Sequence, residues 1–186
     1  MLNLIYRLLL TFNSTSLLIV VFLVKEQVVI DWSLLHPKLT ALPSYISYIV
    51  FFLIPVLLTY VSLHLAKFLD GDSLEKTGGD SKIAEVEQAN NAFLPSYLGY
   101  FFVALSVPYC ETLYFVFGVL CLFTFFSQTL YFNPLFLIFR YQFYYLTTIH
   151  RSKIFIITRK SLKKPIDIDL TNLKRINNFT FIDMEK

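Results

Sequence analysis

Residues 93–139 read FLPSYLGYFFVALSVPYCETLYFVFGVLCLFTFFSQTLYFNPLFLIF, and Glu111 is the only charged side chain among them. One helix over this stretch would be about 70 Å long, more than twice the roughly 30 Å of hydrocarbon in a bilayer. The chain must therefore turn back within the stretch. Residues 106–112 suit that turn, because a proline is followed there by polar residues and a carboxylate. We predict two membrane spans, 94–107 and 112–132.

Two further apolar segments precede this stretch. Residues 4–24 contain a single charge, Arg7, close enough to the end of the span to reach the headgroups. Residues 45–66 contain no charge that would prevent insertion, and about 20 apolar residues are enough to cross a bilayer as a helix. The sequence therefore predicts an all-α integral membrane protein whose residues 1–139 form about four transmembrane helices.

The composition of the whole chain agrees with a membrane location. Of its 186 residues, 56% are hydrophobic and only 16% are charged, whereas soluble domains contain about 25% charged residues. Cys110 and Cys121 lie in or beside apolar spans and have the sequence context of packing residues. Because the sequence contains no phosphate-binding loop, H-E-x-x-H or G-x-S-x-G motif, we predict no catalytic, cofactor-binding or metal site and do not expect an enzyme.

The basic residues are concentrated in a C-terminal tail, residues 140–186. The tail holds ten Lys and Arg against four Asp and Glu, a net charge of +6, whereas the rest of the chain carries −3. Basic segments remain on the cytoplasmic side of bacterial inner membranes. We therefore predict a multi-pass inner-membrane protein with both termini in the cytoplasm, an outward segment at 25–42 and a cytoplasmic loop at 67–91. Within that loop, the apolar spacing of residues 83–93 predicts a short amphipathic helix.

The tail contains signals for a small α/β element. Residues 144–149 and 153–158 are β-branched and aromatic runs separated by three polar residues, which predicts a hairpin. A short helix is predicted after Asp169 or Thr171, and residues 178–183 alternate like a strand. About 45 residues are too few to enclose a core of their own. We therefore expect the strand-like segments to bury their apolar side chains against a partner.

Two groups of side chains within the predicted membrane domain are candidate sites. Four consecutive polar residues interrupt the first span: Asn13, Ser14, Thr15 and Ser16. Inside a bilayer such groups bond across helices or to their own backbone, so we interpret them as packing contacts, with a water-lined pathway as the alternative. Glu111 lies at the predicted outward turn and is a candidate for contact with an external signal. His64, near the inner end of the second span, is interpreted as an interfacial residue.

The tail also supplies candidate partner-binding residues. Its densest basic cluster consists of Arg159, Lys160, Lys163 and Lys164. Each basic residue near a bilayer attracts anionic lipid by roughly 1 kcal/mol, which makes membrane lipids the first expected partner. The same cluster, together with Phe179 and Phe181, is the alternative candidate for docking a soluble protein, since strand edges accept partner strands. Direct binding of nucleic acid is not expected, because the basic residues lie next to the bilayer.

Two stretches of the tail carry a family resemblance when they are combined with the size and the span pattern. Residues 157–165 read ITRKSLKKP and residues 173–182 read LKRINNFTFI. The chain resembles the KwaA family, the membrane subunits of the bacterial Kiwa anti-phage defence system. The resemblance implies a homo-oligomeric membrane sensor, with a tetramer as one such assembly, that detects phage attack at the envelope. It also implies that the sensor recruits and controls KwaB, a cytoplasmic DNA-binding effector.

A second functional class remains open from the residues alone. A small homo-oligomeric channel or transporter would place the polar patch at Asn13–Ser16 around a pore between copies, and a lipid-organising protein would need only the aromatic belts and the basic tail. The spans contain no charged residue at the midplane of the kind that transporters use. Both the defence sensor and the channel are expected to be homo-oligomers, because the hydroxyl and amide groups of the spans need burial and contacts between copies would bury them.

Overall fold

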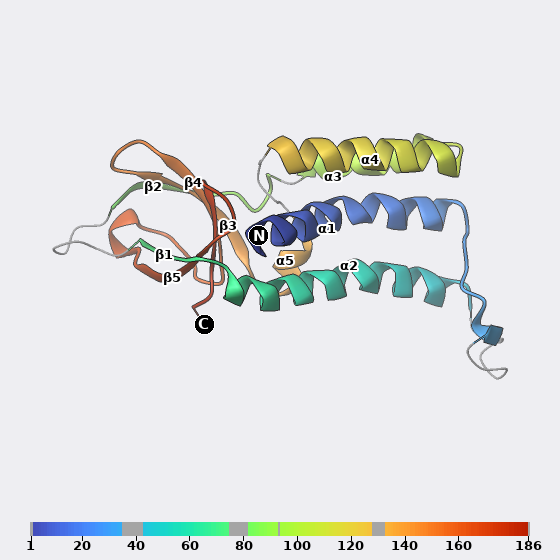
Figure 1. Cartoon of the computed structure of the whole chain (residues 1–186), viewed down its shortest axis with the longest axis horizontal. Coiled ribbons are helices and arrows are strands. Elements are labelled where there is room, and N and C mark those ends of the chain that lie inside the picture. Colours follow the sequence, from blue (N-terminus) through green and yellow to red (C-terminus); the bar gives the residue numbers. More distant parts are fainter. Residues whose placement is uncertain (1, 35–42, 75–81, 93, 128–132, 186) are drawn as a thin grey trace.

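The computed structural model describes residues 2–34, 43–74, 82–92, 94–127 and 133–185, and it divides into a helix bundle and a β-sheet (Figure 1). The bundle consists of α1 (Leu2–Lys25), α2 (Tyr45–Leu65), α3 (Leu94–Ser106) and α4 (Cys110–Ser127), followed by the one-turn helix α5 (Leu135–Ile138). We call the end of the bundle that meets the sheet the sheet end. The opposite end, which carries the segment after α1 and the turn between α3 and α4, is called the turn end.

Three of these helices are long and apolar enough to cross a membrane: Asn3–Lys25, Tyr45–Phe68 and Cys110–Ser127. Helix α3 has 13 residues, so it is about 20 Å long and shorter than the hydrocarbon core. The prediction of about four transmembrane helices is therefore corrected: among the described residues three helices are long enough to cross as straight helices, and the shorter α3 runs beside α1 to the turn end. The reason is that the helix begins only at Leu94, beside Pro95, and ends before Pro108.

Helix α1 occupies the centre of the bundle and contacts α2, α3 and α4. Its Leu18 and Phe22 pack in one cluster with Ala104 of α3 and Leu113 of α4. The outer helices leave large apolar side chains exposed, such as Phe115, which is 73% exposed. Apolar surfaces of this kind are typical of helices that face lipid.

Six strands form one mixed sheet in the order β1-β5-β6-β4-β3-β2. Its strands are β1 (Gly71–Leu74), β2 (Ile83–Gln88), β3 (Gln142–Thr148), β4 (Lys153–Thr158), β5 (Leu170–Arg175) and β6 (Thr180–Asp183). Strands β4 and β6 pair in parallel, and the other neighbouring pairs are antiparallel. Strands β1 and β2 form the two edges of the sheet. The predicted loop 67–91 and the predicted tail therefore build one sheet together.

This sheet shows that the all-α fold class is wrong, since the described residues are about 54% helix and 20% strand. The predicted hairpin is confirmed as β3 and β4. The two short helices predicted in residues 83–93 and after Asp169 are instead the strands β2 and β5. Both strands carry apolar residues three positions apart, Ile83 with Val86 and Leu170 with Leu173, and both have an irregularity in their pairing. A bulge shifts the alternation of a strand by one residue, so the apolar spacing resembled that of a helix.

Both faces of the sheet are buried, which explains the continuous apolar run of β4. Phe155 and Ile157 pack on one face with Phe143, and they share a cluster with Tyr6 and Leu63 from the sheet end of the bundle. The alternate residues of β4 point to the opposite face, where the cluster consists of Ile83, Tyr144, Leu146, Ile154, Ile156, Ile168, Leu170, Leu173 and Phe181. Strands buried on both faces lose the polar alternation. The expectation that the tail needs an external partner to bury these residues is therefore wrong.

Candidate functional site

The polar patch of α1 is buried and bonds to all three neighbouring helices. The amide nitrogen of Asn13 donates to the hydroxyl of Thr59 in α2 at 2.7 Å. The hydroxyl of Thr15 lies 3.1 Å from the sulfur of Cys121 in α4, and the hydroxyl of Tyr97 in α3 donates to the carbonyl of Ser14 at 2.7 Å. The Ser16 hydroxyl donates to the carbonyl of Asn13. Hydrogen bonds between helices and to the helix backbone are what the packing interpretation expects of these residues.

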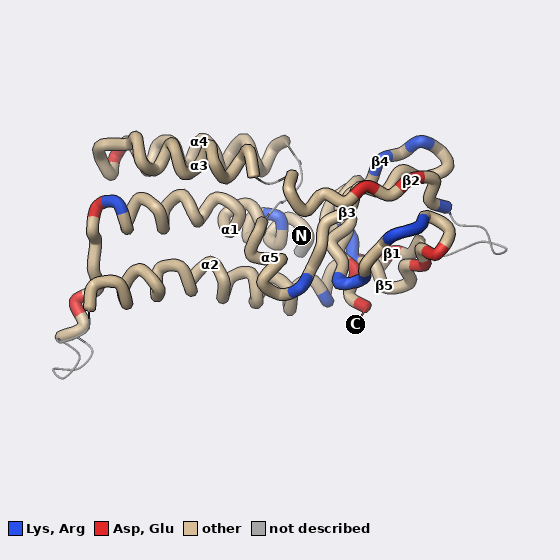
Figure 2. The backbone as a smooth tube through the Cα atoms, turned by 180° about the vertical axis from the view of Figure 1, so that it is seen from behind, with Lys and Arg blue, Asp and Glu red and all other residues tan. Residues whose placement is uncertain are grey.

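The turn end carries a small group of charges (Figure 2). Lys25 at the end of α1 donates to the carbonyl of Val107, just beyond α3, and pairs with Glu26 at 3.0 Å. This contact holds the turn between α3 and α4 level with the end of α1. Glu111 lies exposed in the first turn of α4, and its carboxylate forms no ion pair with the described residues. The predicted sensing residue is therefore accessible at this end.

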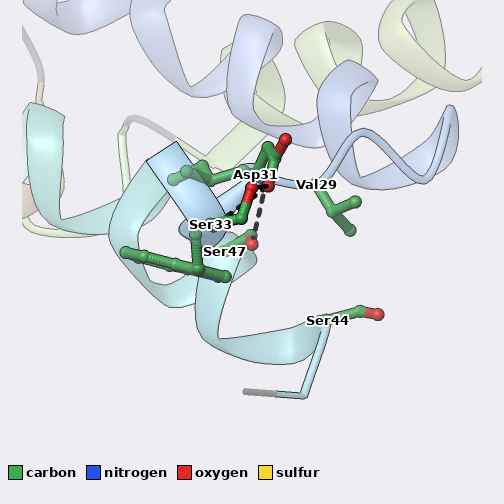
Figure 3. Close-up of a pocket in the computed structure, with 7 residues that line it drawn as sticks. Val29, Asp31, Ser33, Ser44 and Ser47 are labelled. Atoms are coloured by element: carbon green, nitrogen blue, oxygen red, sulfur yellow. Dashed lines mark hydrogen bonds between the residues drawn. The ribbon is translucent and has the colours of Figure 1, made fainter. Parts of the chain in front are cut away.

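A polar cavity of about 330 Å³ lies beside the turn end, between the segment after α1 and the start of α2 (Figure 3). The carboxylate of Asp31 accepts hydrogen bonds from the hydroxyl of Ser33 at 2.6 Å and from its backbone N–H at 3.0 Å. These bonds lower the pKa of Asp31, so the group is ionised at neutral pH. Ser47 of α2 accepts a hydrogen bond from the backbone of Ile30 at 3.1 Å. Sequence reasoning missed this site, because its residues come from two segments that only the fold brings together.

The two aromatic residues predicted to bind a partner have opposite environments. Phe181 in β6 is 7% exposed and packs in the sheet core with Ile156 and Leu173. Phe179, in the turn before β6, is 62% exposed. Of the two, only Phe179 is therefore available at the surface, because β6 begins at Thr180 and Phe179 still belongs to the turn before it.

The basic cluster of the tail is also divided. Lys160 forms an ion pair with Glu185 at 2.5 Å, and this hydrogen bond lowers the pKa of the Glu185 carboxyl. Arg159 lies over the ring of Tyr141, 4.6 Å from its centroid. Two further members, Lys163 and Lys164, lie exposed in the segment before β5. The four residues thus serve different contacts and do not form one uniform basic surface.

A second cavity, of about 200 Å³, lies where α2 meets the sheet. It is lined by Tyr60 and His64 of α2 and by Lys67 just beyond its end. On the other side it is lined by Tyr141, Arg159 and Glu185, which lie next to the ends of β3, β4 and β6. Burial raises the pKa of the Tyr141 hydroxyl, and the nearby Arg159 opposes this effect. Sequence reasoning named Arg159 and His64 separately but did not join them, because they are almost one hundred positions apart. We call this the junction cavity.

Comparison with known families shows to which family the chain belongs. The sequence model of the family described as anti-phage protein KwaA matches residues 6–182, which run from α1 to β6. The chain belongs to the KwaA family. The resemblance seen in the tail is therefore confirmed, and the KwaA match covers the helix bundle and the whole sheet. No curated protein and no solved structure matches the chain.

Membership of the KwaA family makes the chain an anti-phage defence protein. Within the part of the chain that the structure describes, no group of three or more His, Cys, Asp or Glu could hold a metal ion. The described residues of this KwaA-family chain include two cavities with polar linings, one at the turn end and the junction cavity, and several exposed side chains in the turns of the sheet.

Proposed function

We propose that this KwaA-family chain is the membrane-embedded sensor and anchor subunit of an anti-phage defence complex. It recruits and controls a cytoplasmic DNA-binding effector of the KwaB type and has no catalytic site of its own. One observation carries this proposal: the loop 67–91 and the tail form a single folded sheet at one end of the bundle, whereas only short segments lie at the other end (Figure 1). A chain built in this way offers a docking domain to one compartment and short contact segments to the other.

The distribution of basic residues supports a cytoplasmic position for the sheet end. The tail, net +6, belongs to this end, and both chain termini lie there too (Figure 1). Under the positive-inside rule the turn end then faces outward. In this orientation Glu111 and the polar cavity around Asp31 are presented outside the bacterial inner membrane, where a signal of phage attack at the envelope arises.

Helix α1 is the element that would connect the two faces. Its 24 residues give a length of about 36 Å. At the turn end, Lys25 bonds to the carbonyl of Val107. At the sheet end, the amide of Asn3 donates to the carboxylate of Asp70 at 2.8 Å, and Tyr6 is buried in the cluster that contains Phe155. A displacement of the turn end that shifts α1 would therefore be transmitted to the sheet, because this one helix contacts both ends.

Phe179 is the proposed anchor for the effector. Exposed aromatic side chains are enriched among the residues that dominate binding energy at protein interfaces. Two other large apolar side chains of the sheet domain are similarly exposed: Ile149 in the β3–β4 turn at 57%, and Ile166 in the one-turn 3-10 helix Pro165–Asp167 at 63%. They serve as matched controls, because an aspartate there also replaces an exposed apolar side chain by a charge, but on a different surface of the sheet domain.

The test uses the full-length protein expressed with its effector. Phe179→Asp should abolish both co-purification of the effector and phage protection, while membrane insertion and oligomer size remain as in the wild type. Ile166→Asp should preserve all four properties. If Phe179→Asp retains the effector and the protection, the docking role of Phe179 is rejected, and the exposed edge of β2 in the loop 67–91 becomes the next surface to test.

We also propose that the subunit assembles as a homo-oligomer, with a tetramer as one such assembly. Helices α3 and α4 expose large aromatic side chains, among them Phe102 and Phe126, and contacts between copies would cover part of this surface. Mass measurement in a mild detergent should return a multiple of the 21.7 kDa chain. A monomer as the sole species would reject this assembly without affecting the effector test.

A further inference from the structure

We infer that the junction cavity binds the phosphate of an anionic phospholipid and so clamps the sheet against the membrane. The cavity lies where the last turn of α2 meets the sheet. Its lining includes the cationic side chains of Lys67 and Arg159 and the imidazole of His64. The inference rests on the membrane placement proposed above. It is tested by lipid binding to the purified protein, so the result does not depend on effector recruitment or on phage protection.

The charges of the cavity favour an anion. Lys67 forms no hydrogen bond or ion pair with the described residues, and Arg159 is held only by the ring of Tyr141 at 4.6 Å. Its guanidinium donors are therefore free to bind oxygen atoms, and a guanidinium fork matches the geometry of a phosphate. Glu185 is the one carboxylate of the lining, and Lys160 already pairs with it. The lining consequently has an excess of positive charge.

The size of the cavity suits a headgroup. At about 200 Å³ it is smaller than the roughly 300–1,000 Å³ pockets that hold drug-sized ligands. Its floor is partly apolar, since Leu63, Phe139 and Met184 contribute to it. A phosphate with its glycerol therefore fits, provided that the acyl chains remain outside.

A path for those chains leads directly from the cavity. Leu57, Tyr60 and Val61 are exposed on α2, and residues three, four and seven positions apart share one face of a helix. His64 continues this same face into the cavity, where its ring lies 4.5 Å from the ring of Tyr60. The exposed Phe68, just beyond the end of α2, adds an aromatic residue at the same level. Tyrosine rings such as that of Tyr60 gather where hydrocarbon meets headgroups, and an apolar path beside the cavity favours a lipid over a soluble phosphate compound.

Native mass spectrometry of the full-length protein in detergent tests the site, with phosphatidylglycerol titrated against phosphatidylcholine. The double variant Lys67→Gln/Arg159→Gln should lose about 10- to 30-fold in affinity for phosphatidylglycerol. The matched control Lys163→Gln/Lys164→Gln removes the same charge from the exposed tail and should bind as the wild type does. An equal loss in both variants would show that total charge, and not the cavity, attracts the lipid.

A third variant gives a gain that misfolding cannot produce. Glu185→Gln removes the one carboxylate of the lining and releases Lys160, so phosphatidylglycerol should bind more tightly than to the wild type. Unchanged or weaker binding would reject the site. Glycerol 3-phosphate at millimolar concentration should neither bind alone nor displace the lipid. If it binds with the same dependence on Lys67 and Arg159, the cavity is a site for a soluble phosphate compound and the lipid assignment is rejected.

Discussion

Asn13 in α1 donates a hydrogen bond to Thr59 in α2, with 2.7 Å between the amide nitrogen and the hydroxyl oxygen, and both side chains are fully buried. The hydroxyl of Thr59 donates in turn to the carbonyl of Pro55 at 2.9 Å. A polar chain therefore runs from the central helix into the backbone of α2. Because both side chains are fully buried, neither partner can readily exchange this contact for water.

The first prediction is that these two residues are energetically coupled. A double-mutant cycle of Asn13→Ala and Thr59→Ala should give a coupling free energy of about 0.5–1.5 kcal/mol, as interhelical hydrogen bonds in membranes do. The measurement is reversible unfolding of the full-length protein in micelles. The control cycle pairs Asn13→Ala with Ser62→Ala, whose hydroxyl bonds within α2 to the carbonyl of Thr59; this cycle should be additive. Additivity in both cycles would contradict the prediction.

The second prediction tests the sheet that joins the loop to the tail. Glu85 of β2 lies directly opposite Thr147 of β3, and the Cα atoms of facing residues in antiparallel strands are about 4.5–5.5 Å apart, within disulfide range. In a background without Cys110 and Cys121, Glu85→Cys/Thr147→Cys should form a disulfide on mild oxidation, detected by peptide mass spectrometry. Gln88→Cys/Thr147→Cys is offset by three positions and should remain reduced. Equal cross-linking of both pairs would argue against the fixed register.

The β3–β4 hairpin could be predicted from the sequence because its signals are local. The β-branched and aromatic runs 144–149 and 153–158 surround a short polar turn, and Arg151 in that turn has a positive φ of 62°. The long apolar helices are local features for the same reason, since length and composition define them. Each of these elements is specified by residues that are close in the chain.

The edge strands and the junction cavity could not be predicted, because each depends on distant residues. Strand β5 pairs with β1, so that Leu173 faces Asp72 across about one hundred positions. Because the pairing of this strand is irregular, Leu170 and Leu173 are both buried although they are three positions apart, and that spacing is also typical of a helix. Lys67 and Arg159 likewise become neighbours only after the sheet has formed. The charge of the tail indicated a binding role, but it did not indicate which charges remain free.

The third prediction concerns the ion pair between Lys160 and Glu185. The hydrogen bond from Lys160 lowers the pKa of Glu185 below its ordinary value of 4.5, so the pair stabilises the fold above that pH. The stabilisation is lost as the pH falls through the lowered pKa, because the carboxyl is then protonated in both states. The melting temperature of Glu185→Gln should therefore lie below that of the wild type at neutral pH, and the difference should vanish once the pH is below the lowered pKa of Glu185. High salt should reduce the difference at neutral pH; a difference that is independent of pH would contradict the role of the charge.

The fourth prediction is the orientation of the chain, and it rests on the shared position of the loop and the tail. A reporter that is active only outside the cytoplasm should be silent after Lys186 and within the loop 67–91, because both segments belong to the sheet end. It should be active after His36, which lies outside the described residues, and also after Tyr109 in the turn between α3 and α4. The contact between Lys25 and the carbonyl of Val107 holds that turn level with the end of α1, although α3 is too short to cross the hydrocarbon as a straight helix. Activity after Lys186 with silence after His36 would invert the proposed placement. Silence after Tyr109 alone would mean that α3 and α4 enter and leave on the sheet side.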